Sequence, residues 1–191
     1  MYGPEKDFFS RSRTQARVGT FLNIENYYSH TMEQFAVPKA FFVTAGVAQD
    51  GASELNAFDI ALKDAGITQC NLVNVSSILP ADCVEIAPLT IPAGAITFCV
   101  MAKMAGTSGE HIGCGIGWAW GTLPEGGKYG IVAEHHGYCD EEYAQKKLLI
   151  KLKRMAEVRK LTLTETKTCI RSIEVKESKY GYVVTALVYT N

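Results

Sequence analysis

Segments with the apolar and β-branched pattern of strands outnumber helical segments in this chain, and this imbalance constrains the fold most. Two helices are predicted, one over 54–64 after the capping residue Ser53 and one from Asp140 to about Glu157. Strands are predicted over 39–49, 70–75, 94–105, 112–121, 129–136, 162–175 and 180–189. Because several strands separate the two helices, we expect an α+β fold in which sheet packs on sheet and the helices lie outside.

The order of these segments suggests how the chain is divided. The strands over 94–105 and 112–121 are expected to form a hairpin with Ser108 and Gly109 in its loop. No repeat or linker interrupts 38–191, so a single domain is expected there. Residues 1–37 lack a clear period but contain several aromatic side chains, which favours an N-terminal arm or extension over a purely disordered tail.

Composition excludes several classes of function. The 191 residues carry 19 basic and 20 acidic side chains, so we expect no nucleic-acid partner and no anionic membrane surface. The chain shows neither a signal peptide nor a run of roughly 20 apolar residues, and a cytoplasmic location is expected. Six cysteines are scattered singly and His135 and His136 are adjacent, so we expect no metal site.

The serine pair Ser76-Ser77, at the end of the strand predicted over 70–75, is the most informative chemical feature. A serine hydroxyl can attack the preceding peptide carbonyl and form an ester if the turn is strained and the oxyanion is stabilised. β-Elimination then leaves dehydroalanine, and hydrolysis gives an N-terminal pyruvoyl group. A Ser-Ser pair alone is weak evidence, since most such pairs are ordinary turn residues.

The residues around the pair carry a family resemblance. The segments Leu55-Asn56-Ala57-Phe58-Asp59, Asn71-Leu72 and Val75-Ser76-Ser77-Ile78-Leu79-Pro80 resemble the pyruvoyl-dependent arginine decarboxylases in residue order and spacing. Val132-Ala133-Glu134 before Gly137 resembles the family's strand with a catalytic glutamate. The resemblance runs from about Lys39 to the C-terminus. It implies a four-layer αββα sandwich that is cut between residues 76 and 77 into a β chain (1–76) and an α chain (77–191).

Three residues are predicted to be catalytic. Ser77 would become the covalent pyruvoyl cofactor, which condenses with a substrate amine and accepts electrons during decarboxylation. Glu134 is the candidate general acid, since desolvation in an apolar strand favours its neutral form; the alternative is a structural carboxylate paired with a lysine. Asn71 would donate to the oxyanion or orient the scissile carbonyl, or it is an ordinary edge-strand residue that bonds to backbone.

Three residues are predicted to bind substrate. Asp59 matches the family's substrate-side acid, and a carboxylate can meet a guanidinium through two parallel hydrogen bonds. The alternative for Asp59 is a solvent-facing helix carboxylate. Leu62 and Ile78 are predicted to line the apolar walls along the methylene stem of the substrate.

The resemblance also implies an assembly and leaves some points open. It implies a homotrimer or a dimer of trimers with active sites between subunits, so that Ser77 and Glu134 would come from neighbouring chains. The chain departs from the family pattern at His135, where an aromatic residue, usually Tyr, is expected, and in its longer 1–37 segment.

The predicted reaction is decarboxylation of L-arginine to agmatine and carbon dioxide. The alternatives are the same chemistry on another amino acid such as histidine, ornithine or lysine, or an uncleaved structural or regulatory subunit. A serine hydrolase is disfavoured because there is no G-x-S-x-G elbow around Ser77.

Overall fold

Two five-stranded β-sheets lie face to face in the computed structural model, which describes residues 37–191. Sheet A has the strand order β2-β5-β10-β1-β4, and sheet B has the order β3-β7-β6-β8, with β9 also paired to β6. The strands are β1 Ala40–Asp50, β2 Asn71–Asn74, β3 Ile78–Leu79, β4 Val84–Glu85, β5 Ile96–Thr107, β6 His111–Thr122, β7 Lys128–Gly137, β8 Thr162–Leu163, β9 Lys167–Glu174 and β10 Tyr180–Thr190.

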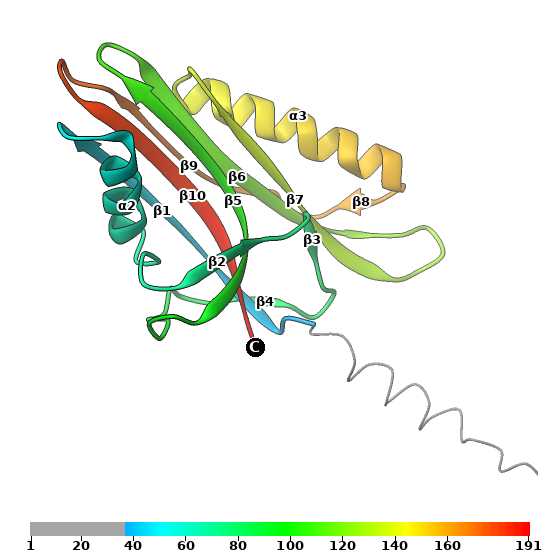
Figure 1. Cartoon of the computed structure of the whole chain (residues 1–191). Helices are drawn as coiled ribbons and strands as arrows, with labels where there is room; N and C mark the ends of the chain where they lie inside the picture. Colours follow the sequence, from blue (N-terminus) through cyan, green and yellow to red (C-terminus); the bar gives the residue numbers. More distant parts are fainter. Residues whose placement is uncertain (1–36) are drawn as a thin grey trace, which may run out of the picture. The chain divides into compact units, whose positions relative to one another are not determined.

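One helix covers the outer face of each sheet (Figure 1). Helix α2 (Glu54–Asp64) packs on β1 and β10 of sheet A, and helix α3 (Glu141–Arg159) packs on β6 and β7 of sheet B. The layers are therefore helix, sheet, sheet and helix, which confirms the predicted α+β sandwich with helices outside. No helix within 37–191 combines the length and the apolar character needed to cross a membrane.

Both helices begin at the predicted caps. The Ser53 side chain accepts a hydrogen bond from the backbone N–H of Asn56, and the Asp140 side chain accepts one from the N–H of Tyr143. Such caps satisfy donors that have no partner within the helix. Helix α2 packs directly on β1, where a Cβ added to Gly46 would lie 2.0 Å from the carbonyl oxygen of Ala61.

The main core lies between the two sheets. Phe41, Val100 and Leu187 of sheet A meet Ile116 and Val132 of sheet B in one buried cluster. Strand β10 is buried from Gly181 to Tyr189, because one of its faces meets sheet B and the other meets α2. This strand pairs with β1 on one side and with β5 on the other, so it forms the centre of sheet A.

The predicted hairpin over 94–105 and 112–121 is wrong. Both strands exist, as β5 and β6, but β5 lies in sheet A and β6 in sheet B, and they do not pair. The turn at Ser108 and Gly109 carries the chain from one sheet to the other. Strands with apolar faces can gain as much by packing face to face as by pairing edge to edge, and the local sequence does not distinguish these outcomes.

Residues 1–36 lie outside the described part of the chain, and so do nearly all residues of the predicted N-terminal arm over 1–37.

Candidate active site

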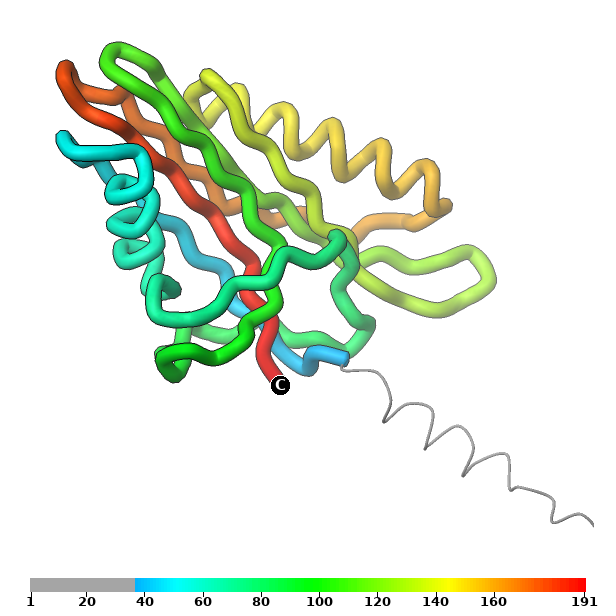
Figure 2. The backbone as a smooth tube through the Cα atoms, in the orientation of Figure 1, coloured from blue at the N-terminus to red at the C-terminus, as the bar shows by residue number. Residues whose placement is uncertain are grey.

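The Ser76-Ser77 peptide lies between β2 of sheet A and β3 of sheet B. The path of the chain through this part of the fold can be followed in Figure 2. Upstream, the N–H of Val75 donates to the carbonyl oxygen of Cys99 on β5 of sheet A, at 3.0 Å. Downstream, the carbonyl oxygen of Ser77 accepts from the N–H of Val132 on β7 of sheet B, also at 3.0 Å. The scissile peptide is therefore attached on both sides, to a different sheet on each side.

A backbone donor already contacts the scissile carbonyl. The N–H of Ile78 donates to the carbonyl oxygen of Ser76 at 3.1 Å, the hydrogen-bond pattern of a γ-turn centred on Ser77. Attack on this carbonyl would place negative charge on the Ser76 oxygen, and a donor held at that oxygen stabilises such charge. The arrangement provides one element of an oxyanion hole.

A single peptide unit links this donor to sheet B. The carbonyl of Ser77 and the N–H of Ile78 belong to the same peptide group, which accepts from Val132 and donates to Ser76. Hydrogen bonds in such a chain polarise and strengthen one another. Pairing with β7 therefore both orients and activates the donor at the scissile carbonyl.

Left-handed backbone does not account for the geometry of the serine pair. Strain was named as one condition for attack by the hydroxyl, and neither Ser76 nor Ser77 has a positive φ. The non-glycine residues with positive φ in the described part are Lys160 and Ser178, both remote from the pair in sequence. The hydrogen bonds, and not left-handed backbone, hold the pair in its bend.

Ser77 and Glu134 line the same pocket of a single chain. The pocket has a volume of about 400 Å³, and its wall is completed by Val132 and Ala133 of β7 together with Ile150, Lys151, Arg154 and Met155 of α3. Within one chain the two residues already line one pocket, and the arrangement of the site between subunits stays a prediction. Strands β3 and β7 are antiparallel neighbours in sheet B, and this pairing brings Ser77 close to Glu134.

Glu134 is half-buried and lies on the inner side of β7. Side chains alternate along a strand, so Glu134 shares its face with Val132, which belongs to the core between the sheets. Desolvation raises the pKa of the Glu134 carboxyl, and the positive charges of His136 and Lys151 partly oppose this shift. A carboxyl with a raised pKa holds its proton to higher pH than a solvated glutamate, as a general acid must.

His135 points the other way, toward α3. Its ring centroid lies 6.0 Å from that of Tyr143, and its Nδ1 lies 3.5 Å from Nζ of Lys151. Desolvation, and after it the charge of Lys151, lowers the pKa of His135. The departure from the family pattern at this position therefore lies on the opposite face of β7 from Glu134.

Lys151 joins these two residues. Its Nζ donates to the backbone carbonyl oxygen of Glu134 and contacts the His135 ring. Strand β3 is short and pairs with β7 at Ile131 and Gly130, so the lysine satisfies a carbonyl on a part of β7 that β3 does not cover. The sequence alone did not indicate a role for Lys151 in the site, because a lysine on an amphipathic helix is usually solvated.

The predicted substrate-binding residues are divided between two places. Asp59 lies exposed on α2, where its Oδ1 accepts from the hydroxyl of Thr68 at 2.8 Å, and Leu62 packs between α2 and sheet A. Ile78 is beside the serine pair on β3, with 41% of its surface exposed. The structure thus brings Ser77, Glu134 and Ile78 together, whereas Asp59 and Leu62 lie on the outer side of the other sheet (Figure 1).

Asn71 lies at the start of β2. Its backbone N–H donates to the carbonyl oxygen of Ala95, and its side-chain amide donates to that of Gly94, at 2.9 Å. Within one chain the amide thus supports the turn at Gly94, and the donor that contacts the Ser76 oxygen is Ile78. A catalytic role for Asn71 stays a prediction.

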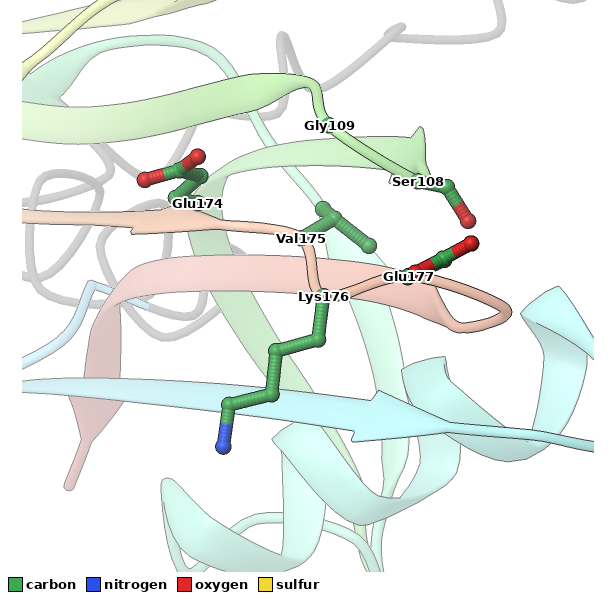
Figure 3. Close-up of a pocket in the computed structure, with 6 residues that line it drawn as sticks. All are labelled: Ser108, Gly109, Glu174, Val175, Lys176 and Glu177. Atoms are coloured by element: carbon green, nitrogen blue, oxygen red, sulfur yellow. The ribbon is translucent and has the colours of Figure 1, made fainter.

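Another surface pocket lies at the turn between β5 and β6. It has a volume of about 700 Å³ and is lined by Ser108, Gly109 and residues 174–177. Figure 3 shows the Lys176 side chain directed away from those of Glu174 and Glu177, so the charged groups do not converge on one point. The pocket beside the serine pair is therefore the better candidate for chemistry.

Comparison with known proteins supports the family resemblance. A family model described as pyruvoyl-dependent arginine decarboxylase matches residues 40–191, which include the whole site. A pyruvoyl-dependent arginine decarboxylase of Methanopyrus kandleri is 35% identical over 153 residues, covering 80% of this chain and 97% of the relative. The Thermococcus sibiricus protein of that name is 34% identical over 146 residues, or 75% and 90% of the two chains.

The two lysines of α3 near His135 provide a test of the electrostatics. Lys151→Met should raise the pKa of both Glu134 and His135, because its positive charge lowers both. Lys147→Met should raise the pKa of His135 alone, since its charge acts on His135 and not on Glu134. Titration of both side chains by NMR would measure these pKa values. An unchanged pKa of Glu134 in Lys151→Met would show that the charge of Lys151 does not act on Glu134.

Proposed function

Because the chain belongs to the pyruvoyl-dependent arginine decarboxylase family, we propose that it cuts itself between Ser76 and Ser77 and then converts L-arginine to agmatine and carbon dioxide. The observation that carries this proposal is the Ile78 N–H on the Ser76 carbonyl oxygen, beside a pocket that contains Glu134. The protein is thus a carboxy-lyase, and its cofactor is a pyruvoyl group derived from Ser77.

The cut begins at the Ser77 hydroxyl. Its oxygen attacks the carbonyl carbon of Ser76, the amide C–N bond breaks, and an ester joins the Ser76 carbonyl to the Ser77 oxygen. The N–H of Ile78 stabilises the negative charge that forms on the Ser76 oxygen during this step. Loss of the Ser77 α-proton and cleavage of its Cβ–O bond release Ser76 as a carboxylate, and water then replaces nitrogen at residue 77 with release of ammonia.

Strand pairing would hold the two fragments together after the cut. Strand β1 belongs to the upstream fragment and β10 to the downstream one, and they pair along their lengths from Ala40 with Thr190 to Asp50 with Tyr180. Helix α2 packs on both strands. The fold therefore does not depend on the broken peptide bond.

The residues around Ser77 fit the pyruvoyl group. The group supplies a carbonyl that takes up the substrate amine and accepts the electrons released when carbon dioxide leaves. The N–H of Val132 holds the amide oxygen of residue 77, which fixes the orientation of that residue. Glu134 holds a proton in a partly desolvated carboxyl and delivers it to the substrate carbon that has lost its carboxylate.

Asp59 would act in a site completed by a second copy of the chain. It lies on α2, on the outer side of sheet A, while Ser77 and Glu134 line a pocket with α3 of sheet B. This separation supports an assembly in which Asp59 and Leu62 of one subunit complete the pocket of the next, and the family resemblance makes that assembly a homotrimer or a dimer of trimers. A carboxylate there would pair with the guanidinium of arginine.

The cut requires the Ser77 hydroxyl. The native chain should give two fragments that meet between Ser76 and Ser77, and Ser77→Ala should give one full-length species, because it lacks the attacking oxygen. Intact-mass measurement on denatured protein distinguishes these. Ser108→Ala is a matched control in the sheet-to-sheet turn at Ser108 and Gly109, and it should be cut normally. A native chain that stays whole would instead favour an uncleaved structural or regulatory subunit.

Glu134→Gln should lower the rate of decarboxylation by roughly 10²- to 10⁴-fold, the usual contribution of a general acid. In the native enzyme the rate should fall as pH rises through the raised pKa of Glu134, because the protonated form is the active one. Carbon dioxide release across a pH series measures both effects. Glu125→Gln, in the turn between β6 and β7, is the control. Near-native turnover in Glu134→Gln would remove this residue from the acid role.

Asp59→Asn should raise the KM for arginine by roughly 10- to 100-fold, the value of a charged hydrogen bond, and leave the cut unaffected. Asparagine keeps an oxygen for the hydroxyl of Thr68 and loses only the charge. Glu54→Gln, on the same helix, controls for the loss of a negative charge. Steady-state kinetics on fully cut protein measures the KM for arginine. An unchanged KM would show that Asp59 does not bind the guanidinium of the substrate.

A further inference from the structure

Tyr189 connects sheet A to the residue that directly follows the serine pair. It lies near the end of β10, with 8% of its surface exposed, and its side chain belongs to the core cluster between the sheets. Its hydroxyl donates to the carbonyl oxygen of Ile78 on β3 at 2.8 Å. Burial raises the pKa of this hydroxyl, so it stays protonated and remains a donor at any working pH.

The backbone groups of Ile78 face away from β7. In an antiparallel pair, successive residues direct their backbone groups alternately toward and away from the partner strand. Ser77 directs its carbonyl toward β7, where it accepts from Val132, so the groups of Ile78 lie on the opposite side. There the N–H of Ile78 donates to the Ser76 oxygen and its carbonyl accepts from Tyr189.

We propose that Tyr189 is a positioning residue for self-cleavage, which acts by fixing Ile78 so that its N–H stays on the scissile carbonyl. Strand β3 has only two residues, and its pairing with β7 fixes the side of Ile78 that faces sheet B. Tyr189 fixes the other side. Rotation of Ile78 about its backbone would withdraw the donor from the Ser76 oxygen, and the Tyr189 hydrogen bond opposes that rotation.

This role differs from simple burial of a tyrosine. A buried hydroxyl needs a partner, and any carbonyl between the sheets would serve that purpose. The partner here is the carbonyl of the same residue whose N–H contacts the scissile peptide. The inference rests on the proposed self-cleavage and adds to it a residue 112 positions from Ser77 along the chain.

The chain offers a matched pair of tyrosines for the test. Tyr182 lies on the same strand with the same exposed fraction of 8%, but its ring packs on Phe58 of α2 at 4.7 Å between centroids. In the part of the chain that the structure describes, its hydroxyl makes no hydrogen bond to the serine-pair segment. Tyr182→Phe therefore removes an equivalent hydroxyl on the opposite face of the same sheet.

The experiment is a time course of cleavage in the full chain made by cell-free synthesis, with intact mass as the readout. Tyr189→Phe should slow the cut roughly tenfold, the effect of one hydrogen bond, while Tyr182→Phe cuts at the native rate. Replacement of Tyr189 by 4-aminophenylalanine, which keeps a donor on the ring, should restore most of the rate. Thermal melting followed by circular dichroism checks that each variant folds.

Three results would overturn the inference. A native rate in Tyr189→Phe, or equal slowing in Tyr182→Phe, would show that the hydroxyl does not position Ile78, and self-cleavage itself would stand. Failure of 4-aminophenylalanine to restore the rate in a folded chain would show that packing, and not the donor, matters. A native chain that is never cut would instead overturn the proposed self-cleavage.

Discussion

Contact between the apolar inner faces of the two sheets is the interaction on which the rest of this structure depends. Strand β10 can be buried on both faces only because sheet B covers one and α2 the other. To build both sheets from one chain, some strands that follow each other in sequence must lie in different sheets. The chain therefore crosses from one sheet to the other after β2, β3, β5 and β9. The serine pair lies in the first of these crossings.

The crossing after β2 and the crossing after β5 have the same length but different bonding. After β5, Gly109 adopts a positive φ of 81°, and the Glu110 carboxylate accepts from the N–H of Thr107. Two further backbone hydrogen bonds join this turn to Val175, which follows β9. The crossing at 75–77 contains no glycine; besides the local bond from the Ile78 N–H to the Ser76 carbonyl, its bonds run to Cys99 and Val132 on the two sheets. The peptide of the serine pair is thus held in place by contacts with both sheets.

Because side chains alternate along β7, Glu134 and His135 lie on opposite faces of the strand and in different electrostatic surroundings. Glu134 shares its face with the inter-sheet core, where desolvation raises the pKa of its carboxyl. His135 faces α3, where desolvation and the lysine charges lower its pKa. Lys151 contacts the backbone carbonyl of the first residue and the ring of the second, so one cation influences both. A change at position 135 would therefore reach Glu134 through Lys151.

The sequence alone determined where the helices begin and which family the chain belongs to. Caps at Ser53 and Asp140 bond within three residues, so local residues suffice to predict where α2 and α3 begin. The pattern around Ser76, Ser77 and Glu134 likewise pointed to the decarboxylase family that the comparisons support. Only the tertiary structure decided that β5 and β6 do not pair, that Ser77 and Glu134 share a pocket while Asp59 lies apart, and that Ile78 is bonded both to the Ser76 carbonyl and to the Tyr189 hydroxyl. These contacts join residues far apart in sequence, and several use backbone groups that every residue possesses, so no residue pattern could reveal them.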